Sequence, residues 1–326
     1  MTRLRRYIKT NRPVRAALFL AQYASHGTRS LFARGALTAT LAERPPYLLV
    51  AMVRVKNEAR FLPEWLAHHL NVGVEHFYIY DNNSTDDITS AVEPFAARGL
   101  ITHIPWSTMP VSPSSHIDFL RRFGHTTTWC MFLDVDEFLM ETSPGDLVAF
   151  LTSHERWPAV AINSRYFGIG GHETIPRGLV TEQFTRAQGR YNDHVKVIAQ
   201  PRAIHAYRNP HSFYYTRWRL ARAPDGRRVF GTFVRTVDDP RFVVHHYVNR
   251  SREDYENKRR RGYATAAGER AQQRRASWSD IALSKYDDVT VIVPSSITRA
   301  TGELLEELGY PEELYAPSAQ GNLHTG

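Results

Sequence analysis

Short apolar segments alternate, through the first half of the chain, with segments whose apolar residues recur at helical spacing. The short segments are rich in β-branched and aromatic side chains, which favours strands over helices. The predicted strands are residues 47–55, 75–80, 100–105, 129–133 and 159–163. This alternation predicts an α/β fold with an open, mixed but mostly parallel sheet that has helices on both faces.

Helix signals lie between these strands and again near the C-terminus. The predicted helices are residues 59–70, 88–98, 114–122, 143–153, 251–275 and 302–308. Ser143 and Pro144 are expected to be the N-cap and first residue of one helix, and Ser251 with Asp254 forms a variant capping box for another. Between residues 175 and 248 the apolar runs shorten and are broken by Gly and Pro, which predicts a small antiparallel layer.

Composition excludes several classes of protein. The single cysteine, Cys130, allows neither an internal disulfide nor a cysteine-based zinc site. No run of 18 apolar residues exists, so we expect no bilayer-spanning helix. Residues 45–326 carry equal numbers of basic and acidic side chains, which argues against a basic nucleic-acid-binding fold.

The formal net charge of +8 comes wholly from residues 1–44, which carry nine basic side chains and one acidic side chain. A basic segment with scattered apolar residues is typical of a helix that lies on anionic lipid. On this hypothesis the protein is cytoplasmic and peripheral at the inner face of a membrane. A disordered tail and a cleaved secretion signal are the alternatives for this segment.

Polar clusters follow three of the predicted strands directly. They are Lys56-Asn57-Glu58, the segment 81–87 (DNNSTDD) and the segment 134–138 (DVDEF). Because ligands of open α/β sheets bind outside the carboxyl ends of the strands, the three clusters predict one binding site at that edge.

Asp134 and Asp136 are the strongest chemical signal in these clusters. In an extended chain, side chains two residues apart face the same way, so a cation is expected between the two carboxylates. Their hard oxygens favour Mg²⁺ or Mn²⁺, which commonly also bind phosphate oxygens of a substrate. The alternative is that the two aspartates are exposed acids that cap a helix. An aspartate-nucleophile phosphohydrolase is disfavoured, because Phe138 stands where that chemistry expects Thr or Val.

The ordered motifs of residues 50–262 resemble glycosyltransferase family 92 and related family-2-like transferases. The resemblance rests on 55–58 (VKNE), 64–66 (EWL) with His69, 73–84 (GVEHFYIYDNNS), 134–138 (DVDEF), 166–168 (YFG), 171–172 (GH), 196–201 (KVIAQP), His211, 246–251 (HYVNRS), Lys258 and Gly262. It implies a GT-A fold, a nucleotide-sugar donor (by default a uridine diphosphate sugar) and a divalent metal, Mn²⁺ or Mg²⁺. Residues 45–250 would then be a GT-A-like catalytic domain, and residues 251–326 a helical extension with a tail.

The resemblance also implies roles for single residues. Asp134 and Asp136 would hold the metal, with His246 or His211 as a third ligand, although either histidine could be purely structural. Arg250 and Lys258 would contact phosphate, and Asp81, Asn57 and Glu58 the base or ribose; Ser84 and Asp86 could instead cap the next helix. The implied donor-binding set is Asn57, Glu58, Asp81, Ser84, Lys196 and Arg250, where a structural salt bridge is the alternative for Lys196.

The predicted function is therefore metal-dependent transfer of a sugar from a nucleotide-diphosphate donor to a glycan, glycolipid or other hydroxyl acceptor. Inversion at the sugar carbon would need a general base, for which Glu182, Glu173 and Asp193 are candidates. A non-catalytic nucleotide-sugar-binding protein of polysaccharide assembly is the main alternative, and another metal-dependent, phosphate-handling enzyme is the third. No nucleic-acid partner is expected.

Overall fold

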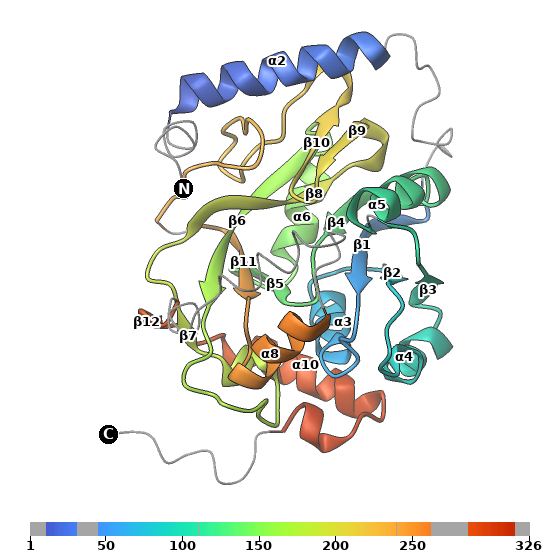
Figure 1. Ribbon diagram of the computed structural model, residues 1–326, viewed down its shortest axis with the longest axis vertical. Coiled ribbons are helices and arrows are strands. Elements are labelled where there is room, and N and C mark those ends of the chain that lie inside the picture. The colour runs from blue at the N-terminus through green and yellow to red at the C-terminus, as the bar shows by residue number, and fades with distance from the viewer. Residues whose placement is uncertain (1–10, 31–44, 110, 239, 262–285, 317–326) are drawn as a thin grey trace.

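The computed structural model describes residues 11–30, 45–109, 111–238, 240–261 and 286–316. Within these ranges, ten strands form one mixed sheet and two more form a separate hairpin (Figure 1). Helices cover both faces of the sheet. This is the α/β, GT-A-like arrangement that the sequence predicts, including its small antiparallel layer.

The parallel half of the sheet has the order β3-β2-β1-β4. Its strands are β1 (Tyr47–Val55), β2 (His76–Asp81), β3 (Ile101–Pro105) and β4 (Thr127–Phe132). Val55 pairs with Asp81 at the carboxyl ends of β1 and β2. Because all four strands run the same way, their carboxyl ends meet at one edge, as the clusters after β1, β2 and β4 require.

The other half of the sheet is mixed. β8 (Asn192–Ala199) is antiparallel to β4 and to β6 (Ala159–Phe167), and β11 (Phe242–Tyr247) is parallel to β6. β5 (Glu137–Glu141) pairs with β11. β7 (Arg186–Ala187) and β12 (Val289–Thr290) lie at the edge of the sheet. β9 (Ile204–Asn209) and β10 (Ser212–Tyr215) form the separate hairpin.

Two apolar cores hold the layers together, one on each face of the sheet. On one face, Trp65 of α3, Phe95 of α4, Phe150 of α6 and Leu305 of α10 pack in the same cluster. On the opposite face, Phe119 of α5 packs with residues of the β9–β10 hairpin. These helices are α3 (Leu62–Asn71), α4 (Ile88–Ala97), α5 (Val111–Arg122), α6 (Asp146–Ser153) and α10 (Ser295–Glu307). The C-terminal α10 therefore shares a core with the first strands of the chain, packing on α3.

Short helices lie in the connections between these elements. They are α7 (Val180–Gln183), α8 (Arg252–Arg261), η1 (Pro201–Ala203), η2 (Thr216–Trp218) and η4 (Glu312–Leu314). The predicted cap of α8 is confirmed, because the backbone N–H of Asp254 donates to Ser251 Oγ at 3.0 Å. The predicted continuation of this helix over 262–275 lies outside the described residues.

Two element predictions are wrong. The helix expected to start at Ser143-Pro144 begins at Asp146, because the Glu141 carboxylate accepts hydrogen bonds from the backbone N–H groups of Gly145 and Leu147. Gly145 occupies the N-cap with φ of 79°, a conformation that glycine adopts without strain. The C-terminal helix is also longer than predicted, since it starts at Ser295 rather than Gly302.

The first described helix, α2 (Arg12–Ser30), lies across the end of the molecule that carries the hairpin (Figure 1). Phe19 is its buried anchor, with ring centroids 5.8 Å from Tyr214 and 6.4 Å from Phe230. None of the described helices combines the length and apolar character that crossing a membrane requires. The rest of the basic segment, residues 1–10 and 31–44, lies outside the described residues.

Candidate functional site

An acidic turn joins β4 to β5 at the carboxyl edge of the sheet. The backbone N–H of Glu137 donates to the carbonyl of Asp134 at 3.0 Å, and the N–H of Tyr247 donates to the carbonyl of Asp136 at 2.8 Å. The prediction that period-two geometry turns Asp134 and Asp136 the same way is wrong, because residues 135 and 136 form a turn rather than a strand. The two carboxylates consequently contact different cations.

Helix α3 fixes the strand that follows this turn. Trp65 Nε1 donates to the carbonyl of Glu137 at 2.8 Å, and His68 Nε2 lies 2.8 Å from the carbonyl of Leu139. His69 Nε2 accepts from the backbone N–H of Leu139 at 3.2 Å, while its Nδ1 faces the Trp65 carbonyl at 2.8 Å. The Trp and His residues of the predicted family motif therefore hold β5, and with it the acidic turn, in place.

Asp134 lies between two cations. Its carboxylate contacts Arg54 at 2.6 Å and Lys196 at 2.8 Å. Burial alone would raise the pKa of Asp134, but Lys196 and Arg54 hold this pKa well below its usual range. Lys196 is itself buried and also contacts Glu137 at 2.7 Å, so it neutralises two carboxylates of the turn at once.

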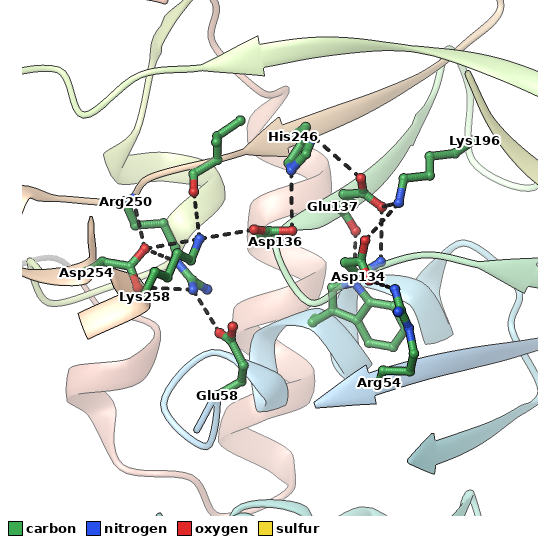
Figure 2. Close-up of polar contacts among 12 residues, drawn as sticks. Arg54, Glu58, Asp134, Asp136, Glu137, Lys196, His246, Arg250, Asp254 and Lys258 are labelled. Carbon is green, nitrogen blue, oxygen red and sulfur yellow. Dashed lines mark hydrogen bonds and ion pairs between the residues drawn. The ribbon is translucent and has the colours of Figure 1, made fainter. Parts of the chain in front are cut away.

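Asp136, Glu137 and His246 form a compact group of ligand atoms, all within 4.8 Å of one another (Figure 2). His246 Nε2 lies 3.5 Å from Asp136, and its Nδ1 lies 3.5 Å from Glu137 Oε1. Burial would lower the pKa of His246, yet the two carboxylates raise it. Glu137 Oε1 is buried and accepts no hydrogen bond from the described residues, so it can act as a ligand atom. Carboxylate and imidazole groups of this kind are ligands of divalent cations.

A second group of charges lies on the other side of Asp136. Lys258 Nζ contacts Asp136 at 3.0 Å and Asp254 at 3.3 Å, and it donates to the carbonyl of Val248 at 2.7 Å. Arg250 is fully buried between Glu58 at 2.8 Å and Asp254 at 3.1 Å. In Figure 2, Arg250, Asp254 and Lys258 lie on one side of Asp136, and Lys258 of α8 contacts it.

The loops after β1 and β2 interlock beside the acidic turn. The backbone N–H of Asn57 donates to Ser84 Oγ at 3.0 Å, and Asn57 Oδ1 accepts from the N–H of Thr85 at 2.8 Å. Asn57 has a φ of 53°, which places its backbone in the left-handed region. Asp81 accepts from the N–H of Ser84 at 3.0 Å. The donor-binding residues predicted after these two strands thus lie in one pair of bonded loops.

Capping of the next helix falls to a residue other than those suggested from sequence. The Asp87 carboxylate accepts from the N–H of Ser90 at 2.9 Å and is the N-cap of α4. Asp86 instead accepts from the N–H of Ala59 at 2.8 Å and ties the two loops together.

The other predicted residues lie apart from the group of three ligands. His211 is in the turn between β9 and β10, where Nδ1 faces the carbonyl of Val195 at 3.1 Å and the ring packs on His194. Glu173 is exposed and forms an ion pair with Arg252 at 2.8 Å. Glu182 lies half-buried on α7. The assignment of these three residues stays a prediction.

Sequence reasoning missed Glu137 and Arg54 as members of the site. Glu137 belongs to the predicted DVDEF cluster, but its position opposite His246 depends on the antiparallel pairing of β5 with β11. Arg54 interrupts the otherwise apolar β1, which is the one signal that could have marked it. A charged residue inside a buried strand commonly has a charged partner.

An acidic turn with basic side chains around it lies at the carboxyl edge of the mixed sheet, so the class is an α/β protein with a candidate ligand site at that edge. The family follows from a direct comparison, because the model of glycosyltransferase family 92 matches residues 50–221, more than half of the chain. The chain therefore belongs to glycosyltransferase family 92.

Two plant members of this family illustrate the relationship. The chain is 28% identical over 165 residues to a family 92 protein of Oryza sativa subsp. japonica. The aligned segment covers 49% of this chain and 28% of the relative. The chain is 30% identical over 168 residues to one of Ricinus communis, covering 49% of this chain and 30% of the relative. The match thus spans less than a third of the length of these relatives.

Solved structures overlap more loosely. S. aureus TarS 1-349 in complex with UDP-GlcNAc overlaps with a TM-score of 0.41 and 14% identity, covering 82% of each chain. HddC from Yersinia pseudotuberculosis overlaps with a TM-score of 0.32 and 8% identity, covering 53% of this chain and 84% of HddC.

Proposed function

We propose that this protein transfers a sugar from a nucleoside diphosphate donor, a uridine diphosphate sugar, to a hydroxyl group of a glycan or glycolipid. The observation that carries the proposal is the convergence of Asp136, Glu137 and His246 beside Lys258 in a member of a glycosyltransferase family. Acid and imidazole ligands next to an ammonium group suit a cation bound together with a diphosphate.

The proposed cofactor is Mn²⁺ or Mg²⁺, held by Asp136, Glu137 and His246. When bound, such an ion neutralises charge that develops on the departing diphosphate. Asp134, already paired with Arg54 and Lys196, would act on the cation through water and would keep the turn in shape. Lys258 lies where it can add a charge-assisted hydrogen bond to a phosphate oxygen.

The nucleoside would occupy the bonded loops after β1 and β2, with Asp81, Asn57 and Ser84 toward the base and ribose. Glu58 and Arg250 pair with each other at 2.8 Å, which supports a positioning role for both. Arg250 Nη1 is buried and has no hydrogen-bond partner among the described residues, so one donor is left for a ligand.

We propose an inverting course, in which one carboxylate removes the proton of the acceptor hydroxyl. Glu182, Glu173 and Asp193 are the candidates for this base. Glu173 would have to leave Arg252 to act, whereas Glu182 has no ion pair within the described part of the chain.

The decisive comparison is between the protein and Asp136→Asn, assayed against a panel of UDP-sugars and acceptors with Mn²⁺ present. The variant should lose transfer by about 100-fold or more, because it removes a ligand of the cation that would neutralise the charge on the departing diphosphate, and its melting temperature should stay within a few degrees of the parent. Glu303→Gln, an exposed acid on α10, serves as control. Full transfer activity in Asp136→Asn would contradict the proposal.

The same assay tests the non-catalytic alternative. A protein that only binds nucleotide sugars would show donor binding with neither hydrolysis nor transfer in the unmodified chain. Binding of a simple sugar phosphate as tightly as UDP would instead favour another phosphate-handling enzyme.

We also propose that α2, with the basic residues around it, contacts an anionic membrane surface from the cytoplasmic side. Leu18 and Leu20 of α2 are each 44% exposed while their neighbour Phe19 is buried, so the helix presents apolar side chains outward. The basic excess of residues 1–44 suits a negatively charged lipid surface.

A further inference from the structure

A cavity of about 970 Å³ lies outside the site described above. It is bounded by the end of β6, the segment 188–193 and the segment 227–238. None of the proposed metal or donor residues lines it. Its volume is at the upper end of that of ordinary ligand pockets, enough for several sugar units.

Arginines dominate the charge of this cavity. Five arginines line it, against the acids Asp193 and Asp238; the arginines are Arg165, Arg190, Arg227, Arg228 and Arg235. Arg227 is paired with Asp225, which leaves four arginines that form no ion pair with any residue in the described ranges. The cavity therefore has a local excess of positive charge, although residues 45–326 as a whole have none.

Polar atoms without partners lie among the residues that line the cavity. Arg165 Nε, Gln188 Oε1 and Thr236 Oγ1 all belong to lining residues, are buried, and have no hydrogen-bond partner among the described residues. Buried polar groups are normally satisfied, so each such atom calls for a ligand or water. Together the three atoms offer both donors and acceptors, as the hydroxyl groups of a sugar require.

Aromatic side chains give the cavity apolar surface. Tyr191, Phe230 and Phe233 line the cavity, and the Arg165 guanidinium lies 4.1 Å from the centroid of the Tyr191 ring. Aromatic rings offer broad apolar faces on which the C–H face of a sugar can pack. Charge, polar atoms and rings in one cavity match a carbohydrate that carries negative groups.

Strand β6 contributes Arg165 to the cavity and pairs with β11, the strand that carries His246. Arg165 pairs with His245 of β11, and the next residue, Tyr166, pairs with His246. The Tyr166 ring packs against the His246 ring with centroids 4.9 Å apart. A chain bound in the cavity thus lies next to the strand that carries a proposed metal ligand.

We propose that this cavity binds an anionic segment of the glycan acceptor, a sugar chain that bears carboxylate or phosphate groups. The identity of the ligand as acceptor rests on the proposed function, but its chemistry rests on the cavity alone. A nucleic acid is disfavoured as the ligand of this cavity, because proteins that bind nucleic acids carry their basic side chains in a stripe along the fold.

The test is direct binding by calorimetry, without any donor, using three probes: tetragalacturonate, a mannose-6-phosphate-terminated oligosaccharide and neutral maltotetraose. The variant is Arg190→Gln/Arg235→Gln, two exposed arginines of the cavity. The control is Arg121→Gln/Arg299→Gln, two exposed arginines on α5 and α10. UDP binding is measured on the same samples, so a failure of the donor site is seen separately.

At least one anionic probe should bind about tenfold or more tightly than maltotetraose, since charge-assisted hydrogen bonds add to its affinity. The cavity variant should lose about tenfold of that affinity and keep its UDP binding, and the control pair should lose neither. The more tightly bound anionic probe identifies carboxylate or phosphate as the recognised group. Three results would each overturn the proposal: equal binding of maltotetraose, unchanged binding by the cavity variant, or equally tight binding of an oligothymidylate.

Discussion

At the scale of single residues, the site is built from charges that already balance one another. Five carboxylates meet four permanent cations and His246; the carboxylates are Glu58, Asp134, Asp136, Glu137 and Asp254, and the cations are Arg54, Lys196, Arg250 and Lys258. A buried charge without a partner is costly, so each group depends on its neighbours. A divalent cation at Asp136 would therefore compete with Lys258.

His68 gives a prediction about stability at this scale. Burial lowers the pKa of His68 to about 4, whereas an unfolded histidine has a pKa of 6.5. Between these values the unfolded chain binds the extra proton, so the free energy of unfolding falls as the pH falls. His68→Gln can still donate to the Leu139 carbonyl but cannot titrate, so its stability should decline less steeply on acidification.

Urea titrations at pH 7 and pH 5 measure this difference. The drop in the free energy of unfolding should be about 2 kcal/mol smaller in His68→Gln than in the parent protein. His154→Gln, at the partly exposed C-cap of α6, should drop as the parent does. Parallel curves for parent and His68→Gln would show that His68 does not contribute to the acid sensitivity.

At the scale of elements, one helix holds another that carries a candidate base. The Glu64 carboxylate of α3 accepts from the backbone N–H groups of Val180 at 2.6 Å and Thr181 at 3.0 Å, and from Thr181 Oγ1 at 2.9 Å. These N–H groups belong to the first turn of α7, where an acceptor is needed. Glu64 thus caps α7 from a distance and fixes the segment that contains Glu182.

Glu64→Ala should leave three buried donors without an acceptor and cost about 3 kcal/mol of folding free energy. Hydrogen exchange should accelerate first at Val180 and Thr181, because the capped turn opens before the core does. Glu64→Gln retains one acceptor oxygen and should give a smaller loss. Unchanged exchange at α7 in the alanine variant would count against this capping role.

The elements also show how far sequence reasoning reaches. The strands β1, β2 and β3 were predictable, because each is an apolar run bounded by polar residues. β5 (Glu137–Glu141) was not, because its first residue is a buried charge and its helix-side partners, Trp65 and His69, lie about 70 residues away. The start of α6 likewise depends on Glu141, a cap supplied from outside the helix.

At the scale of the whole molecule, the predicted meeting of polar clusters at one edge of the sheet is confirmed for those after β1, β2 and β4. The approach of His246 to Asp136 could not be predicted, since it needs β11 to insert between β5 and β6 across about 100 residues of chain. Local patterns define strands and turns, but such long-range pairing depends on the packing of the complete sheet.

The proposed membrane contact is also a property of the whole molecule. Leu18→Glu/Leu20→Glu places two negative charges on the exposed flanks of α2 and should reduce co-sedimentation with phosphatidylglycerol vesicles by about tenfold, through lost apolar burial and added repulsion. Ile292→Glu, at a side chain 77% exposed, is the matched control and should sediment as the parent does. Equal sedimentation of all three proteins would rule out a contact through α2.

We propose that Asp136, Glu137 and His246 hold a divalent cation that in turn binds a nucleoside diphosphate. Calorimetric titration of UDP into the protein, with Mn²⁺ and then with EDTA, tests it most directly, together with Asp136→Asn under both conditions. Mn²⁺ should tighten UDP binding by about tenfold or more, and Asp136→Asn should abolish this gain. Equal UDP affinity in Mn²⁺ and in EDTA, or a full Mn²⁺ effect in the variant, would contradict it.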